Sequence, residues 1–76
     1  MFTREVKDRW SKSSYTISET ERGWSISATI EKWGERTFNS DTLEGLKSRM
    51  RMEIGCTLVP IKKRIYDDIL FKLNRI

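Results

Sequence analysis

Residues 24–33 have the sequence WSISATIEKW, and this stretch decides the fold. From Trp24 to Ile30 every second side chain is apolar, and each position between them holds serine or threonine. Successive side chains of an extended chain point to opposite faces, so the apolar and hydroxyl side chains separate completely. This alternation is typical of a strand whose sheet buries one face and exposes the other. It predicts an antiparallel sheet with its core on one side.

The segments on both sides of this strand predict its neighbours. Residues 15–21, YTISETE, are rich in the aromatic, β-branched and hydroxyl side chains that strands favour. Gly23 follows them, where a tight turn needs positive φ. Residues 32–35 then have the composition of a second turn, and residues 36–39 can form a short third strand. We therefore expect a two- or three-stranded antiparallel sheet over residues 15–39.

A sheet of this size is stable only with helices across its apolar face, and the remaining sequence predicts two. Residues 41–54 repeat apolar side chains at helical spacing. Ser40 or Asp41 can cap the start of this helix, and Gly55 is a natural end. Residues 58–75 form a longer amphipathic stretch, whose single proline falls in the first turn. The expected fold class is α+β, with the sheet packed against two C-terminal helices.

The first twelve residues fit two structures. Phe2, Val6 and Trp10 lie four apart, which suits one stripe of a helix and also one face of a strand. We expect a short N-terminal helix opened by Thr3, or a mobile arm, over residues 1–12. Trp10 is costly to leave in water, so we expect its ring to dock on the domain.

Length and composition restrict the chain to one small domain, residues 1–76. A chain of 76 residues buries roughly 60% of its unfolded surface, and 37% hydrophobic residues supply one thin core. No apolar run approaches the ~20 residues that span a bilayer, and no signal-peptide pattern is present, so we expect no membrane partner. Cys56 is the single cysteine, so we expect no internal disulfide and a reducing, cytoplasmic location.

Few residues are available for catalytic chemistry. Histidine is absent, which removes the commonest acid–base and metal-binding side chain. We expect Cys56 to be a small buried apolar residue; a reactive thiol is the alternative. Asp67 and Asp68 are adjacent carboxylates that we expect on a solvated helix face. No phosphate-binding loop, paired-cysteine motif or nucleophile elbow is present, so we expect a protein that is not an enzyme and holds no cofactor or metal.

The charges are sorted along the chain. Residues 13–46 hold three lysines and arginines against six carboxylates, whereas residues 47–76 hold eight against three. If the two helices form a hairpin around Gly55, six cations can join into one patch that engages phosphates without reading sequence. The alternative is that these cations only solvate the outer faces of the helices. The six candidate binding residues are Lys47, Arg49, Arg51, Lys62, Lys63 and Arg64.

Three large apolar side chains fall outside the expected core. Trp33 has the opposite parity to the core-facing residues of its strand, so we expect it at the outer face or in the turn. There it could stack on a base or anchor a protein, unless it folds back over the sheet edge. Phe71 and Met52 lie off the stripes of their helices, which predicts a helix buried on two sides or a protein interface. A homodimer is a further expectation, since the acidic sheet region could meet the basic helices of a neighbour.

The order of three strands followed by a helix, over residues 15–54, is similar to the arm-type DNA-binding domains of phage-type integrases and to several small phage-encoded inhibitors of host defence. The likeness is one of architecture without a shared motif, so no functional residue is carried over. Our first functional hypothesis is a small basic protein that contacts nucleic acid, DNA or RNA, through the six cations and Trp33. The alternative is a small phage-type regulator or inhibitor that binds an acidic surface of a host protein through Trp33, Phe71, Met52 and the same cations. An enzyme would require an accessible, activated Cys56.

Overall fold

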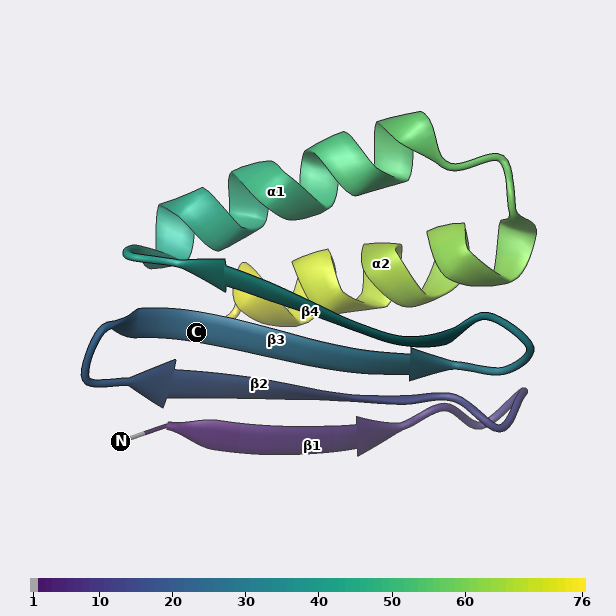
Figure 1. Ribbon diagram of the computed structural model, residues 1–76, viewed down its shortest axis with the longest axis horizontal. Coiled ribbons are helices and arrows are strands. Elements are labelled where there is room, and N and C mark those ends of the chain that lie inside the picture. Colours follow the sequence, from purple (N-terminus) through teal and green to yellow (C-terminus); the bar gives the residue numbers. More distant parts are fainter. Residues whose placement is uncertain (1) are drawn as a thin grey trace.

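Four antiparallel strands in sequential order are followed by two helices, and both helices lie on the same face of the sheet (Figure 1). This computed structural model describes residues 2–76. The strands are β1 (Thr3–Lys7), β2 (Ser14–Thr20), β3 (Gly23–Ile30) and β4 (Gly34–Ser40), and the helices are α1 (Leu43–Cys56) and α2 (Pro60–Leu73). The α+β class is confirmed, with one strand more than the sequence predicted.

β1 replaces the N-terminal helix or mobile arm that we expected over residues 1–12. It pairs antiparallel with β2, from Thr3 opposite Ser18 to Lys7 opposite Ser14. A spacing of four between apolar side chains fits a strand as well as a helix, and the edge of β2 decides between them because it offers a row of backbone hydrogen bonds. The prediction of a helix was therefore wrong.

Trp10 does not dock on the domain, in contrast to our expectation. It lies in the β1–β2 loop and is 78% exposed. The loop is short, because the N–H of Asp8 donates to the carbonyl of Ser13 over 2.8 Å, and Trp10 lies beyond this last pair. Phe2 covers the sheet instead, with its ring centroid 5.9 Å from that of Trp24.

The other three strands follow the sequence prediction. Gly23 adopts a φ of 133° in the β2–β3 turn, as expected for this position. In the middle of the ladder Ile26 lies opposite Ile17 on β2 and opposite Phe38 on β4. Paired residues share a face, so three strands contribute to one apolar surface.

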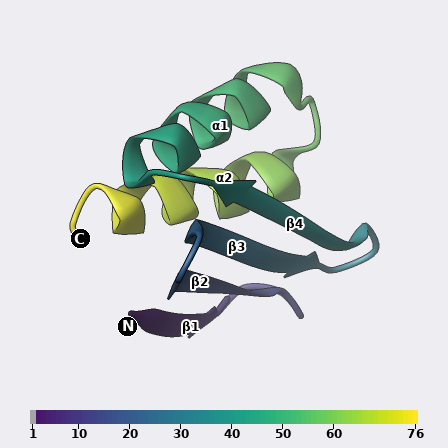
Figure 2. The ribbon, with the colours of Figure 1, turned by 60° about the vertical axis from the view of Figure 1, so that its left-hand side comes forward.

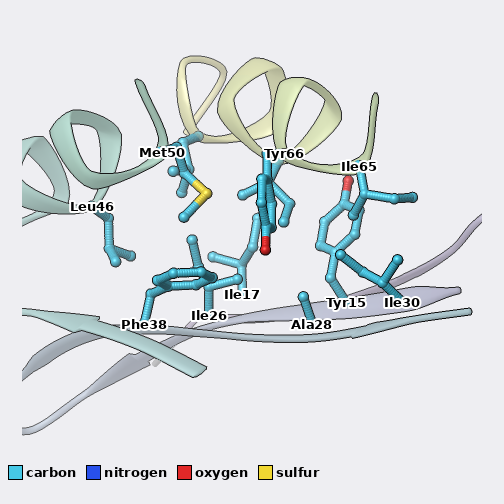
Figure 3. Close-up of a cluster of buried hydrophobic side chains, with 12 residues drawn as sticks. Tyr15, Ile17, Ile26, Ala28, Ile30, Phe38, Leu46, Met50, Ile65 and Tyr66 are labelled. Atoms are coloured by element: carbon cyan, nitrogen blue, oxygen red, sulfur yellow. The ribbon is translucent and has the colours of Figure 1, made fainter. Parts of the chain in front are cut away.

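The core lies between this apolar surface and the two helices. Figure 3 shows the ring of Tyr66 extending from α2 towards the sheet and standing edge-on to Phe38, with centroids 5.8 Å apart and planes at 88°. Burying each large apolar side chain contributes roughly 1.5–3 kcal/mol relative to leaving it exposed. The buried hydrophobic residues are Tyr15, Ile17, Ile26, Ala28, Ile30, Phe38, Leu46, Met50, Ile65, Tyr66, Ile69 and Leu73.

α1 was predicted, but its ends differ from the prediction. Its N-cap is Thr42, whose hydroxyl accepts from the N–H of Gly45 over 3.0 Å, in place of Ser40 or Asp41. The helix also continues through Gly55, which does not adopt positive φ. A glycine ends a helix only where the chain turns into the left-handed conformation, and here the turn comes after Cys56.

α2 lies beside α1 and runs antiparallel to it, so the two helices form a hairpin, with its turn after Cys56 and not at Gly55 (Figure 2). Pro60 is the first residue of α2, where its missing N–H costs no hydrogen bond. Leu58, the first residue of the helix that the sequence predicted, lies before α2 and is 97% exposed. No helix among residues 2–76 has the length and apolar character needed to cross a bilayer.

The opposite face of the sheet carries no helix (Figure 2). The register of the strands places hydroxyl side chains along this face. Its charged residues, Glu5, Lys7 and Glu35, all lie on the two edge strands. The centre of this outer face is therefore polar but uncharged. Its hydroxyl residues are Thr3, Ser14, Thr16, Ser18, Thr20, Ser25, Ser27, Thr29 and Thr37.

Candidate binding surfaces

The six predicted cations are divided among different sides of the helical hairpin, and two are already paired. Nη1 and Nη2 of Arg64 donate to the two carboxylate oxygens of Asp8, over 2.6 and 2.9 Å. This guanidinium holds the pKa of Asp8 well below its usual range. Nζ of Lys47 donates to Glu44 over 3.1 Å, and only 15% of the lysine side chain is exposed. Both cations are therefore already paired with a carboxylate of the domain itself.

Arg51 and Lys63 are exposed, and within residues 2–76 neither forms a salt bridge. Successive residues of a helix are about 100° apart, so Arg51 and Arg49 point to nearly opposite sides of α1. The six cations thus do not lie in one continuous field. The remaining two, Arg49 and Lys62, join residues of the sheet.

Phe38 holds two arginines from different elements. The guanidinium carbons of Arg36 on β4 and Arg49 on α1 lie 4.9 and 5.3 Å from the centre of its ring. Such cation–π contacts contribute roughly 0.5–1 kcal/mol each at exposed sites. Arg36 also forms an ion pair with Glu53 of α1. Ring and carboxylate together fix both guanidinium groups where β4 meets α1.

Trp33 lies in the β3–β4 turn, one of the two places predicted, and is 53% exposed. Nζ of Lys62, in the first turn of α2, is 4.9 Å from the centre of its ring. Lys62 and Arg36 line the same small cavity of about 140 Å³, so the two cation–aromatic groups adjoin each other. We refer to Trp33, Arg36, Arg49 and Lys62 as the cation–aromatic surface.

The small cavity behind this surface also contains a buried hydroxyl group. Tyr66 lines the cavity, and its hydroxyl has no hydrogen-bond partner among residues 2–76. Figure 3 shows the hydroxyl pointing from α2 towards the sheet. Cys56, Thr57 and Glu53 complete the lining. Two cations and a hydroxyl donor against one carboxylate favour a group with an anionic oxygen.

Arg36 was missed by the sequence reasoning. It lies two residues before Phe38 on β4, so both side chains point to the face that the helices cover. The spacing of two between Arg36 and Phe38 could have predicted from the sequence that Arg36 lies on the helix side of the sheet. Arg36 lies within residues 13–46, whose net charge is negative, and not in the basic stretches of the two helices.

A second surface lies between α2 and β1. Val6, Trp10 and Phe71 line a groove of about 530 Å³, together with the ion pair of Arg64 and Asp8. We call it the β1–α2 groove. Its apolar residues come from β1, the β1–β2 loop and α2, so only the folded chain brings them together.

Phe71 and Met52 are both exposed, at 54% and 60% respectively. Phe71 is therefore not buried on a second side of α2, and the guanidinium carbon of Arg75 lies 5.3 Å from its ring. Met52 lies on α1, apart from the residues that line the groove. An interface role for both side chains stays a prediction.

Tyr15 lines the groove and connects it to the core. Its hydroxyl donates to Oδ2 of Asp68, and Nζ of Lys72 lies 3.8 Å from the other oxygen of this carboxylate. Burial and the hydrogen bond to Asp68 raise the pKa of Tyr15 well above its usual value. The neutral tyrosine thus holds α2 against β2.

Replacing Tyr15 with phenylalanine is expected to lower the free energy of unfolding by about 1 kcal/mol at neutral pH, because Asp68 loses a donor. The pKa of Tyr15 is higher in the folded than in the unfolded protein, so the wild type loses this advantage as the pH rises above about 10. The difference between the proteins should then shrink by about 1.4 kcal/mol per pH unit. Urea unfolding at neutral pH and at about pH 10.5 measures it. A difference that widens with pH would contradict the assignment.

Cys56 is exposed at the end of α1, so our expectation that it is buried was wrong. The cause is the continuation of α1 through Gly55, which carries the thiol to the rim of the small cavity beside Lys62. Of the two adjacent carboxylates, Asp67 is exposed as expected, whereas Asp68 is engaged by Tyr15. The absence of enzymatic activity stays a prediction.

Comparison with known protein families, curated proteins and solved structures yields no match. The likeness to integrase arm-type domains and phage inhibitors therefore rests on element order alone. The observed order adds a strand before and a helix after the one that was compared. The two surfaces themselves are the basis for a functional assignment.

Proposed function

We propose that this protein is a non-enzymatic binding protein that contacts nucleic acid through the cation–aromatic surface. The observation that carries the proposal is that three cations, each from a different element, are held beside two aromatic rings. Arg36 and Arg49 lie at Phe38. Lys62 lies at Trp33. Nucleic acid offers phosphates for such cations and base faces for an exposed ring.

The balance of charge favours this surface over the outer face of the sheet. Its three cations face Glu53 as the one carboxylate that lines the adjoining cavity. The outer face of the sheet instead has an uncharged centre, with Glu5, Lys7 and Glu35 at its edges. Phosphates are therefore attracted more strongly to the first surface than to the second.

Trp33 favours single-stranded nucleic acid as the ligand. Lys62 occupies one part of the ring, and the residue remains 53% exposed in a turn. A base stacked on an aromatic side chain contributes roughly 1–3 kcal/mol, and bases are free to stack only where they are unpaired. One cation at an exposed ring, with two more at the adjoining Phe38, suits a short stretch of single strand.

The double variant R49A/K62A is expected to weaken binding about 10- to 100-fold and to reduce the salt slope of log affinity by about two. Fluorescence anisotropy with labelled single strands and duplexes of mixed sequence, in DNA and RNA, measures both quantities over a salt titration. K12A/R22A is the matched control, because it removes the same charge from exposed loop positions. We expect it to change affinity much less.

The variant W33A separates stacking from charge. It is expected to lower affinity for single strands about tenfold while changing affinity for duplexes little. The absence of binding to all four ligands at low salt would overturn nucleic acid as the partner. Equal losses in R49A/K62A and K12A/R22A would overturn the assignment of the surface.

A second candidate function is a small phage-type regulator or inhibitor that binds a host protein. The observation that favours it is the exposure of Phe71 and Trp10 along one groove. Capture of a polypeptide from nuclease-treated lysate by the wild type, and its loss in F71A, would support this function. Retention of the same partner by F71A would contradict it.

A further inference from the structure

β1 is a free edge of the sheet. The strand order β1-β2-β3-β4 leaves it with one neighbour. Figure 2 shows it at the end of the sheet away from both helices, whereas β4, at the other end, lies under α1. An exposed edge strand presents a row of backbone N–H and C=O groups that another strand can bind.

The ladder between β1 and β2 fixes which of these backbone groups are free. The carbonyl of Phe2 accepts from the N–H of Glu19 on β2 over 2.7 Å. The N–H of Asp8 donates to the carbonyl of Ser13, which directly precedes β2, over 2.8 Å. In an antiparallel ladder every second residue bonds to a given neighbour, so the even-numbered residues bond to β2. The residues whose backbone groups point outward are Thr3, Glu5 and Lys7.

The charges of β1 select one way of pairing two copies. Two copies related by a twofold axis pair antiparallel, and only odd-numbered residues bond across this edge. Each bonded pair therefore joins two odd-numbered residues. In every such register, the residue at the twofold axis lies opposite the same residue of the second copy. A register centred on Arg4, Glu5 or Lys7 places that charge directly opposite its own copy, which is unfavourable. The register centred on Val6 avoids this and places Glu5 opposite Lys7 of the second copy, twice.

The same register also matches charges on the helix-facing side. Arg4 lies opposite Asp8 of the second copy, and each Asp8 is already held at this edge by its own Arg64. The β1–α2 groove, with Trp10 and Phe71, borders the same edge. Pairing therefore brings two grooves together and covers part of their apolar surface.

β4 offers no equivalent. Its charged residues, Glu35 and Arg36, are adjacent and point to opposite faces of the sheet. In an antiparallel pair of two copies they cannot lie opposite each other. Arg36 is also held by Phe38 and Glu53. Charge matching thus distinguishes β1 from the other edge.

We propose that this protein forms a symmetric homodimer through β1, which joins two four-stranded sheets into one continuous sheet. Charged side chains on an edge strand ordinarily prevent pairing. In β1 the charges disfavour the registers centred on Arg4, Glu5 and Lys7 and favour the one centred on Val6. This match specifies a second copy of the chain as the partner. This dimer differs from the contact between acidic sheet and basic helices that the sequence suggested.

Charge reversal at Glu5 and Lys7 tests the dimer. E5K or K7E alone places like charges opposite each other at two symmetry-related positions, and each is expected to weaken dimerisation about tenfold or more. An equimolar mixture of E5K and K7E restores both attractive pairs in a heterodimer, and E5K/K7E restores them in a homodimer. Sedimentation equilibrium of the full chain measures all four.

Glu35→Lys is the matched control, because it makes the same charge change as E5K on the same face but at the other edge. It should leave dimerisation unchanged, and circular dichroism confirms that each variant is folded. A wild type that stays monomeric up to about 1 mM would overturn the proposal. A mixture that associates no better than its single components would also overturn it.

Backbone hydrogen exchange locates the interface independently. The N–H groups of Glu5 and Lys7 should gain protection as the protein concentration rises, because they point outward from β1. Those of Arg4 and Val6 bond to β2 and should be equally protected at all concentrations. Exchange at Glu5 and Lys7 that does not change with concentration would place any dimer contact elsewhere and overturn the proposal.

Discussion

Replacing Gly23 with alanine is expected to lower the free energy of unfolding by about 3 kcal/mol or more. Its φ of 133° is a backbone conformation that residues with a Cβ rarely adopt. A Cβ would also lie 2.3 Å from the carbonyl oxygen of Ser40 and 2.7 Å from the Cα of Asp41. Both are backbone atoms, so no side-chain rotation relieves the overlap. Strain and overlap add at the point where the β2–β3 turn meets the end of β4.

Urea unfolding followed by tryptophan fluorescence measures this loss. A domain of this length has a total of roughly 4–11 kcal/mol, so Gly23→Ala should approach complete loss of stability. Gly55→Ala is the matched control, since a Cβ there meets nothing within 4 Å and alanine favours a helix. We expect it to gain about 0.5–1 kcal/mol. Wild-type stability in Gly23→Ala would show that the turn has another geometry.

Replacing Phe38 with alanine is expected to lower the free energy of unfolding by about 4 kcal/mol. The ring is 2% exposed and stands edge-on to Tyr66 in the centre of the core. Its removal leaves a cavity between β4 and the helices that the surrounding strands cannot close. It also removes the ring beside which Arg36 and Arg49 lie. The same substitution therefore damages the core and the cation–aromatic surface together.

Phe38→Leu separates the two effects. Leucine keeps most of the buried volume, so we expect a cost below about 1.5 kcal/mol and a folded protein. Without an aromatic ring, the two arginines lose their cation–π contacts, and nucleic-acid affinity should fall several-fold in anisotropy measurements. A loss of less than about 1 kcal/mol in Phe38→Ala would contradict the position of the ring in the core.

The central strands and both helices could be predicted because their signals are local. The alternation from Trp24 to Ile30 specifies a half-buried strand whatever its neighbours are. A spacing of three from Leu43 to Leu46, followed by four to Met50, fits one stripe of a helix and does not fit one face of a strand. β1 could not be assigned, since the spacing of Phe2 and Val6 suits both structures. Its partner, β2, settled the choice.

The binding surface was predictable only in part. Trp33, Arg49 and Lys62 were singled out by charge and parity, and all three lie on the cation–aromatic surface. Arg64 was singled out equally, but it is bound to Asp8, which directly follows a strand that the sequence did not predict. Charge along a helix indicates how many cations are available. It does not indicate which of them meet a carboxylate from elsewhere in the chain.

The sequence by itself determined the α+β class, the one-sided sheet and the two C-terminal helices, because periodicity acts within each segment. The tertiary structure decided which edge stays free, which cations are paired and which aromatic rings hold the rest. The physical reason is that ion pairs and cation–π contacts act over a few ångströms between residues far apart in the chain, such as Arg64 and Asp8. Only folding brings those groups within reach of each other.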